Sequence, residues 1–394
     1  MGGILDPMLF RSLRWVGSNL LVPIAIAVFV FAVLEGGCRA GGRLRSGTWP
    51  VTAREKEARL VREIGRAYRP HPFLAMSGRP GGVIRVEGHE AHFNSLGLRG
   101  PEVERPKPKG RFRVVCEGGS TTFDLRASGD AATWPALLAG SLGPGWDVVN
   151  AGFPGWTSVQ SLVSLELRDV DLEPDLVVVF AGINDAQPAG HVPFARDYSA
   201  GHGEILPRVL GAERAPLPLA ARSVFVEWLR LRLGLLEPPA AGSGFAPAWG
   251  WAGGERRDVI PEDAVVVFAR NLRSIAAVAR EYGAKTLFVA QAVRVRERQQ
   301  EADRAYLASW VPGLTLPGYL DALRRYNAAA LALADGRDVF FSDPFADGDF
   351  SDEDFADPMH FSRAGAEKFS RRIAEVAVRI RAGEPVLPAA NIRP

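Results

Sequence analysis

Four polar residues, far apart in the sequence, have types suited to nucleophilic chemistry. Ser120 follows the apolar run in "VVCEGGSTTFD", and Asn184 stands in "AGIND" after a second apolar run. Near the C-terminus, "DPMHFS" contains Asp357 and His360. A carboxylate three residues before an imidazole can fold back in a turn and accept the Nδ1 proton, which leaves Nε2 free to take a proton from a serine. These residues therefore form a candidate set of nucleophile, base and orienting carboxylate.

Each of these pieces is common when it occurs alone. A Gly-Gly-Ser sequence after a strand is more often a turn or a phosphate cradle, and Asp-x-x-His can be half of a metal site or a surface turn. The phosphate cradle is disfavoured because no Lys-Ser/Thr follows at P-loop spacing and no G-x-G-x-x-G pattern occurs. What favours catalysis is the position of the pieces relative to the predicted strands.

Strand-like and helix-like segments alternate from residue 111 to about residue 382. The predicted strands are 111–118, 146–152, 174–182, 284–291 and 338–343, and the predicted helices are 133–142, 157–170, 261–283, 316–336 and 362–382. This order predicts a three-layer α/β/α fold with a parallel sheet covered by helices on both faces. Sites in such sheets lie outside the carboxyl ends of the strands, where the four polar residues would meet.

Composition and charge exclude several functions. The 394 residues are 47% hydrophobic, which is enough to bury a full core. Because 47 basic and 45 acidic residues nearly cancel, no nucleic-acid partner is expected. The two cysteines, Cys38 and Cys116, do not form a disulfide framework. His89 and His92 have a spacing that suits two metal ligands, but no further ligands complete a site, so a polar surface role is favoured and no metal or cofactor is expected.

The N-terminal segment predicts a membrane helix. After a short tail, residues 1–14, the segment 15–36 is about one bilayer span long, and Leu20 to Leu34 is free of charged and polar side chains. A cleaved signal peptide and a buried core helix are the alternatives. More arginines follow the span than precede it, yet a short tail before an uncleaved anchor usually stays in the cytoplasm. We therefore expect a single anchor with the catalytic domain outside the cytoplasm, either periplasmic or at the cell surface.

The rest of the chain divides into a connecting region, a catalytic domain and a tail. Residues 37–110 are predicted to hold a juxtamembrane helix, an extended arm and a linker, residues 111–385 the domain, and residues 386–394 a tail. An insertion, 186–261, interrupts the domain. Within it, "SVFVEWLRLRLGLLEPP" predicts an interfacial helix, a hydrophobic lid, or simply a helix packed on the domain.

The ordered segments resemble the four defining blocks of the SGNH (GDSL-type) hydrolases, whose fold is flavodoxin-like. "EGGSTT", "NAGFPGWTS", "AGIND" and "DPMHFS" match these blocks in order, and "FNSLGLRGPE" is similar to an arm found in membrane-anchored bacterial members. One departure is that Gly119 stands where the family has an aspartate before the serine. This departure leaves the geometry of the serine loop and the substrate preference open.

The resemblance implies a catalytic triad and an oxyanion hole. Ser120 would be the nucleophile, with His360 as base and Asp357 as its partner. The backbone amides of Ser120 and Gly155 and the side-chain amide of Asn184 would form the oxyanion hole, with Gly152 as the alternative to Gly155. In addition, Asp185 is expected to cap or orient the Asn184 loop, or to serve structure alone.

The implied function is that of a serine esterase. It would hydrolyse an acetyl or other short acyl ester on a carbohydrate or lipid, without a cofactor, while its N-terminal helix contacts the membrane. Two alternatives remain open at this point: an O-acyltransferase acting on a cell-envelope polysaccharide, and a non-catalytic binding module that keeps the fold.

Overall fold

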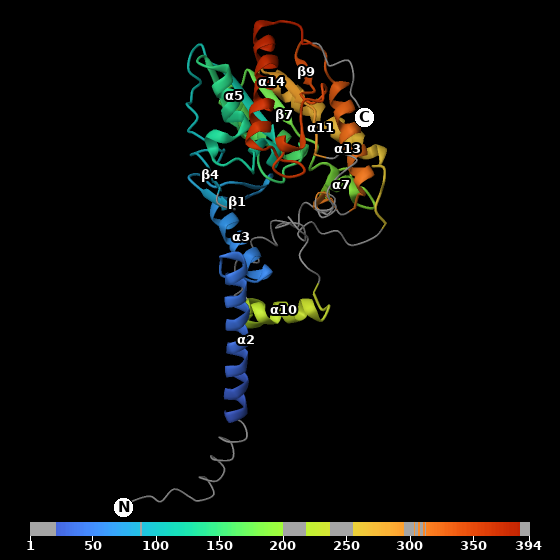
Figure 1. The fold of residues 1–394 in the computed structure, drawn as a ribbon. Helices are drawn as coiled ribbons and strands as arrows, with labels where there is room; N and C mark the ends of the chain where they lie inside the picture. Colours follow the sequence, from blue (N-terminus) through green and yellow to red (C-terminus); the bar gives the residue numbers. More distant parts are fainter. Residues whose placement is uncertain are drawn as a thin grey trace, which may run out of the picture. The chain divides into compact units, whose positions relative to one another are not determined.

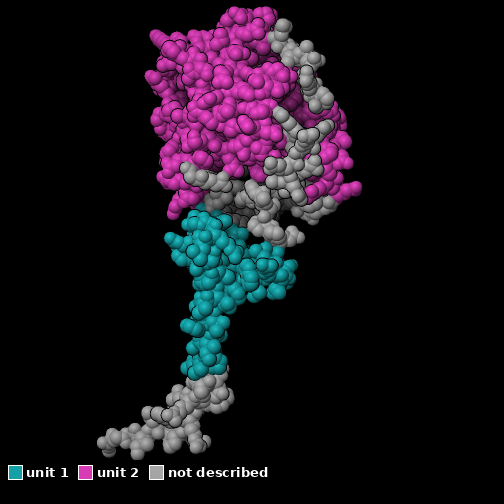
Figure 2. Space-filling view, viewed as in Figure 1, with its two compact units in different colours: residues 1–59, 214–239 teal, residues 60–213, 240–394 magenta. Residues whose placement is uncertain are grey.

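A computed structural model describes residues 21–86, 89–199, 218–236, 255–294, 303, 306–307, 310–311 and 313–386. The chain divides into two compact units, which Figure 2 colours separately. Unit 1 comprises Met1–Arg59 and Arg214–Pro239, and unit 2 comprises Leu60–Glu213 and Ala240–Pro394. Each unit is described by itself below.

The core of unit 2 is a five-stranded sheet in which all neighbouring strands are parallel. Its order is β6-β5-β7-β8-β9. The strands are β5 (Phe112–Gly118), β6 (Trp146–Asn150), β7 (Leu176–Phe180), β8 (Lys285–Val289) and β9 (Val339–Ser342). Strand β5 lies between β6 and β7, so the loops that follow these three strands leave the sheet side by side.

Helices cover both faces of this sheet (Figure 1). On one face, Val114 and Phe180 pack with α5 (Trp134–Leu142) and α14 (Arg363–Ala382). On the other face, Val177 and Val179 pack with α11 (Glu262–Glu281) and α13 (Leu316–Leu331). Residues that alternate along β7 thus reach opposite cores, as a strand buried on both faces requires. The predicted three-layer α/β/α fold is confirmed.

Short helices connect the strands at the edge where the candidate residues lie. Helix α4 (Ser120–Phe123) follows β5, α6 (Ser158–Ser164) follows β6, and α7 (Ala186–Gly190) follows β7. The predicted helix 157–170 is regular only as far as Ser164; it continues as a wider π-helical turn, Leu165–Asp169, and a 3-10 turn, Val170–Leu172. Two more 3-10 turns, Asp130–Ala132 and Asp352–Asp354, lie in the loops before α5 and α14.

Two small hairpins precede the sheet within unit 2. Strands β1 (Tyr68–His71) and β2 (Ala75–Gly78) pair antiparallel, as do β3 (Val83–Val86) and β4 (His89–His92). Their aromatic side chains join a separate core in which Tyr68 and Phe93 contact residues of the sheet loops, Phe123 and Phe153. The segment expected to be an extended arm therefore forms hairpins and packs against the loop that begins with Ser120.

Unit 1 contains the helix predicted to span a membrane. Helix α2 (Val22–Ser46) is long and apolar enough to cross a membrane by length and composition, a test that signal sequences also pass. It does not end at residue 36, as the predicted span does, but continues to Ser46, where Gly47 with φ 72° caps it in the left-handed region. Helix α3 (Ala53–Ala67) begins in unit 1 and ends in unit 2.

The predicted insertion, 186–261, is described only in part. Helix α7 belongs to unit 2, whereas the 3-10 turn Leu219–Arg222 and helix α10 (Val224–Arg232) belong to unit 1. Residues 200–217 and 237–254 of the insertion, like the expected tail 1–14, lie outside the described residues. Of the expected C-terminal tail, only residue 386 is described.

Candidate active site

Three loops at the carboxyl ends of β6, β5 and β7 are joined by hydrogen bonds. Ser120 is the first residue after the turn that ends β5. The backbone amide of Phe153 donates to the carbonyl of Gly118 over 3.0 Å, and Asn184 Nδ2 donates to the carbonyl of Trp156 over 2.8 Å. The structure thus brings the predicted serine, glycine and asparagine segments to one edge of the sheet.

A continuous chain of hydrogen bonds links Ser120, His360 and Asp357. Ser120 Oγ lies 2.8 Å from His360 Nε2, and His360 Nδ1 lies 2.9 Å from both carboxylate oxygens of Asp357. Asp357 Oδ1 also accepts from the backbone amides of Met359 and His360 over 3.0 Å each, so the segment folds back in the expected turn. Ser120 and His360 are each only 3% exposed, which keeps water from competing for these hydrogen bonds.

Arg126 makes a contact with Asp357 that the sequence did not reveal. Its Nε donates to Asp357 Oδ2 over 2.8 Å, on the side of the carboxylate away from the protein backbone amides. Burial acts to raise the pKa of Asp357, but the charge and hydrogen bond of His360 and the hydrogen bond from Arg126 outweigh it, so the pKa lies well below its usual range. Asp357 is therefore held in its ionised form beside His360.

The predicted oxyanion-hole residues differ in how their donors are engaged. Ser120 begins α4, so its N–H is not used by the hydrogen bonds of that helix. The side-chain amide of Asn184 carries two hydrogens and donates one of them to the carbonyl of Trp156. Gly155 has φ 82°, a left-handed conformation that favours glycine. The alternative donor, Gly152, directs its amide to Asn150 Oδ1 over 3.2 Å.

Gly119, the departure from the family pattern, lies directly against Asn184. A Cβ at this position would be 2.4 Å from Asn184 Nδ2 and 3.1 Å from the carbonyl of Trp156. Non-bonded carbon and nitrogen atoms overlap at 2.4 Å, so any side chain here displaces the asparagine amide. Glycine thus allows the amide of Asn184 to lie beside the serine turn.

Asp185 ties the Asn184 loop to the start of α6. Its buried carboxylate accepts from the backbone amide of Ser158 over 3.1 Å and from the hydroxyl of Tyr198 over 3.1 Å. Burial raises the pKa of Asp185 to about 6, and the hydrogen bonds from Ser158 and Tyr198 act in the opposite direction. Asn184 and Asp185 therefore bind neighbouring residues of one segment, Trp156–Ser158, and fix the spacing between two loops of the site.

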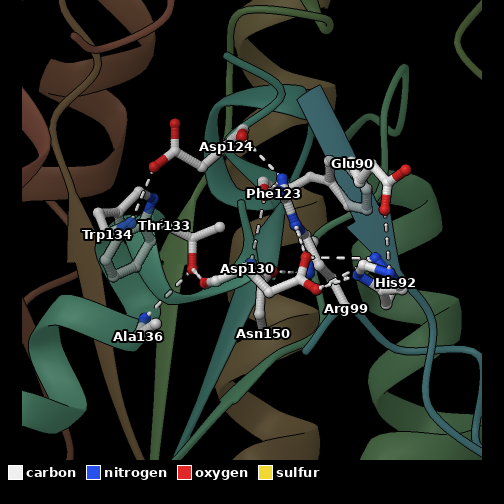
Figure 3. Close-up of polar contacts among 11 residues, drawn as sticks. Glu90, His92, Arg99, Phe123, Asp124, Asp130, Thr133, Trp134, Ala136 and Asn150 are labelled. Atoms are coloured by element: carbon white, nitrogen blue, oxygen red, sulfur yellow. Dashed lines mark hydrogen bonds and ion pairs between the residues drawn. The ribbon is translucent and has the colours of Figure 1, made fainter. Parts of the chain in front are cut away.

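Arg99 anchors the segment that follows the serine, a second role that the sequence did not reveal (Figure 3). Its Nη1 donates to the carbonyls of Phe123 and Asp124 over 2.8 Å and 2.7 Å, while its Nε donates to Asp130 over 2.9 Å. The guanidinium also lies 4.6 Å from the centre of the Phe123 ring. Because Arg99 belongs to the arm before the sheet, the arm holds the C-terminal end of α4 in place.

Of the two histidines whose spacing would suit metal ligands, His92 contacts acidic side chains. His92 Nδ1 lies 2.8 Å from Asp130 Oδ2 and its Nε2 lies 3.5 Å from Glu90, both shown in Figure 3. Across the part of the chain that the structure describes, no group of three or more histidine, cysteine or acidic side chains is arranged to hold a metal ion. Cys38 and Cys116 are both free thiols.

A hydrogen-bonded serine, histidine and aspartate is an arrangement that recurs in acyl hydrolases on several unrelated folds. The family described as GDSL-like Lipase/Acylhydrolase matches residues 116–368, well over half of the chain. The protein therefore belongs to this family and is a hydrolase that acts on ester bonds. The predicted resemblance and the predicted enzyme class are both confirmed.

Solved structures with low sequence identity accompany this match. Est24, a carbohydrate acetylesterase from Sinorhizobium meliloti, is 17% identical; the match covers 68% of this chain and all of Est24, with a TM-score of 0.36. A catalytic mutant of Axe2, an acetylxylan esterase from Geobacillus stearothermophilus, is 15% identical over 67% of this chain and 93% of that one, with a TM-score of 0.38. No curated protein matches the chain significantly.

Proposed function

We propose that the protein is a serine esterase in which Ser120, His360 and Asp357 form the catalytic triad. The observation that carries this proposal is the hydrogen-bond chain from Ser120 Oγ to His360 Nε2, and from His360 Nδ1 to Asp357. In this arrangement His360 takes the serine proton as Oγ attacks the ester carbonyl and returns it to the departing alcohol. Water then attacks the acyl-enzyme with His360 as base, which releases the acid and restores Ser120.

The proposed oxyanion hole consists of the amides of Ser120 and Gly155 and the side-chain amide of Asn184. The negative charge of the tetrahedral intermediate develops on the former carbonyl oxygen, and fixed N–H donors stabilise that charge without reorganising. The support is the position of Asn184, whose Nδ2 lies within 2.4 Å of the point where a side chain on Gly119 would begin. Ser120 is the next residue, so this donor lies beside the nucleophile.

For the substrate, we propose a short acyl group, such as acetyl, on a carbohydrate. This proposal is supported by polar groups near the serine. The side-chain oxygens of Asn184 and Gln291 are buried and have no hydrogen-bond partner among the described residues. Gln291 Nε2 lies 3.5 Å from Thr121 Oγ1, which places Gln291 next to the nucleophile turn. Polar side chains this close to the nucleophile turn favour a hydroxyl-rich alcohol group over a long apolar acyl chain.

The proposal also includes the location, with α2 as a retained anchor and unit 2 outside the cytoplasm. Protease added to right-side-out spheroplasts should then degrade unit 2. Full protection of unit 2, with degradation only after lysis, would place it in the cytoplasm and contradict this part alone.

The catalytic proposal is tested with the full chain in detergent and a fluorophosphonate probe. Wild type is expected to hydrolyse p-nitrophenyl acetate and to carry one probe on Ser120, whereas Ser120→Ala loses both properties. The matched control is Ser128→Ala, an exposed serine in the same loop, which should keep both. Wild type that folds but neither hydrolyses the ester nor reacts with the probe would overturn the proposal in favour of a binding module.

Substrate class is tested separately by comparing acetylated xylo-oligosaccharides with p-nitrophenyl palmitate. The proposal predicts a higher kcat/KM on the acetylated sugar, and a preference for palmitate would refute it while leaving the triad intact. Addition of a free sugar acceptor distinguishes hydrolysis from acyl transfer, since a transferase yields an acylated sugar in place of free acetate.

A further inference from the structure

Helix α10 of unit 1 is attached to α2 at its N-terminal end. Glu35 of α2 accepts hydrogen bonds from Ser223 Oγ over 2.7 Å and from the backbone amides of Val224 and Phe225 over 3.1 Å and 2.9 Å. A carboxylate in this position caps the helix and complements its dipole. Phe31, one turn before Glu35, meets Phe225 edge-on, with ring centres 6.1 Å apart. This attachment lies at the end of the charge-free run of α2.

One side of α10 packs against the first residues of α3. Glu227 accepts from the backbone amide of Ala53 over 2.9 Å, and Glu227, Arg230 and Leu231 line a small cavity together with Ala53 and Arg54. With about 100° between successive helical residues, Phe225, Trp228 and Leu229 lie on the opposite side of α10. Phe225 contacts Phe31, so this opposite side turns toward the apolar part of α2.

The side of α10 that faces away from α3 is apolar and exposed. Trp228 is 47% exposed and Leu229 38% exposed, and Leu233, just after the helix, is 61% exposed. Arg232 places its guanidinium 5.8 Å from the centre of the Trp228 ring. Tryptophan, leucine and arginine on one face are typical of helices that lie in a lipid headgroup region, because the arginine stem covers apolar surface while its charge meets phosphate.

The neighbouring apolar surface is that of α2, which meets this face where Phe31 contacts Phe225. No residue of α2 is buried, and its large side chains from Leu21 to Leu34 are exposed. Within unit 1, α10 runs across α2 (Figure 1). A helix that crosses a membrane-spanning helix at the end of its apolar run lies in the plane of the membrane surface.

We propose that α10 is an in-plane helix that binds the lipid surface, docked on α2 as a retained anchor. Trp228, Leu229 and Leu233 lie at the boundary between headgroups and acyl chains, and Arg232 binds lipid phosphate. Retention of α2 follows from the same contacts, since removal of α2 as a signal peptide would leave Ser223 and the first amides of α10 without Glu35. This inference does not depend on the proposed catalytic residues.

The test measures how deeply a spin label on α10 lies in a bilayer. The full chain, with Cys38→Ser and the buried Cys116 retained, is placed in vesicles of phosphatidylcholine and phosphatidylglycerol with a nitroxide label on Leu229→Cys. Label on Phe29→Cys in α2 serves as the lipid reference, and label on Ser128→Cys, which is exposed in unit 2, as the aqueous reference. Arg230→Cys is the control on the α3 side of the same helix. Circular dichroism checks that each variant is folded.

The readout is the ratio of collisions with oxygen, which concentrates in lipid, to collisions with a water-soluble nickel complex. We expect this ratio at position 229 to approach that at position 29, and the ratio at position 230 to resemble that at position 128. A label at 229 that behaves as in water overturns the proposal. Shielding of this label from both reagents also overturns it, because protein would then cover the face. Mass spectrometry of the mature protein provides a second readout, in which loss of residues up to the start of α3 contradicts the retained anchor.

Discussion

Replacement of Gly119 by alanine is expected to damage catalysis far more than folding. The added Cβ would lie 2.4 Å from Asn184 Nδ2, about 1 Å closer than atoms in contact are found. The amide lies at the end of a side chain, so it can move aside at a small cost in stability. It cannot move and keep both its 2.8 Å hydrogen bond to the carbonyl of Trp156 and its place beside Ser120.

The magnitude follows from the donor that is displaced. Removal of one oxyanion-hole donor costs about a hundred- to a thousandfold in kcat, or about 3–4 kcal/mol of transition-state stabilisation. We expect Gly119→Ala to approach this loss in kcat, with little change in KM, because the donor acts on charge that develops only in the transition state. Gly119→Asp, which restores the family residue, should be at least as inactive, since its larger side chain shares the same Cβ.

The assay is steady-state hydrolysis of p-nitrophenyl acetate together with thermal unfolding of each variant. Gly129→Ala is the matched control: it lies in the same loop with an extended backbone, and its added Cβ would have nothing within 4 Å. Combining Gly119→Ala with Asn184→Ala should give no further loss beyond Asn184→Ala alone, because both changes remove the same donor. Gly119→Ala with kcat within about twofold of wild type, beside a strongly impaired Asn184→Ala, would refute the assigned role of Gly119.

Two further predictions concern the segment after Ser120. Arg99→Met should lower the free energy of unfolding by about 3 kcal/mol, because it removes the buried donor that Asp130 and two backbone carbonyls share. Arg99→Lys should recover only part of this loss. Urea denaturation of both variants measures the difference, and equal stability of the Met and Lys variants would contradict the prediction. Burial raises the pKa of Asp124 from 3.8 to about 6, so between about pH 4 and pH 6 the folded state keeps a proton that the unfolded chain releases. The free energy of unfolding of wild type should therefore fall by about 3 kcal/mol as the pH rises from about 4 to about 6, relative to that of Asp124→Asn. Urea midpoints that shift in parallel for both proteins over this pH range would exclude the effect.

The fold was predictable because its signals are local. Each strand of the sheet is a short apolar run, and each covering helix has an apolar stripe, so their alternation alone implies a parallel sheet. The turn from Asp357 to His360 was predictable for the same reason, since its carboxylate and imidazole are three residues apart. The end of α2 at Ser46 was less accessible, because the glycine pair just after the apolar run weakens a helix without fixing where it stops.

The supporting residues could not be predicted because their partners are distant in the sequence. Arg126 binds Asp357 across 231 positions, and Arg99 binds the carbonyls of Phe123 and Asp124 across 24 and 25 positions. An arginine in a polar loop has the same local pattern whether it is solvated or buried against a carbonyl. Only the three-dimensional arrangement distinguishes the two cases.

Gly119 illustrates how a departure from a motif acquires meaning only through such a distant contact. Along the chain it is a missing aspartate, and the sequence indicates no reason for its loss. In space it lies against the side-chain amide of Asn184, in a loop that Asp185 ties to Ser158. The loop can be no farther away without losing these contacts and no closer without overlap, so a side chain at position 119 requires a different placement of the asparagine. The glycine therefore follows from how tightly the two loops approach each other in this chain.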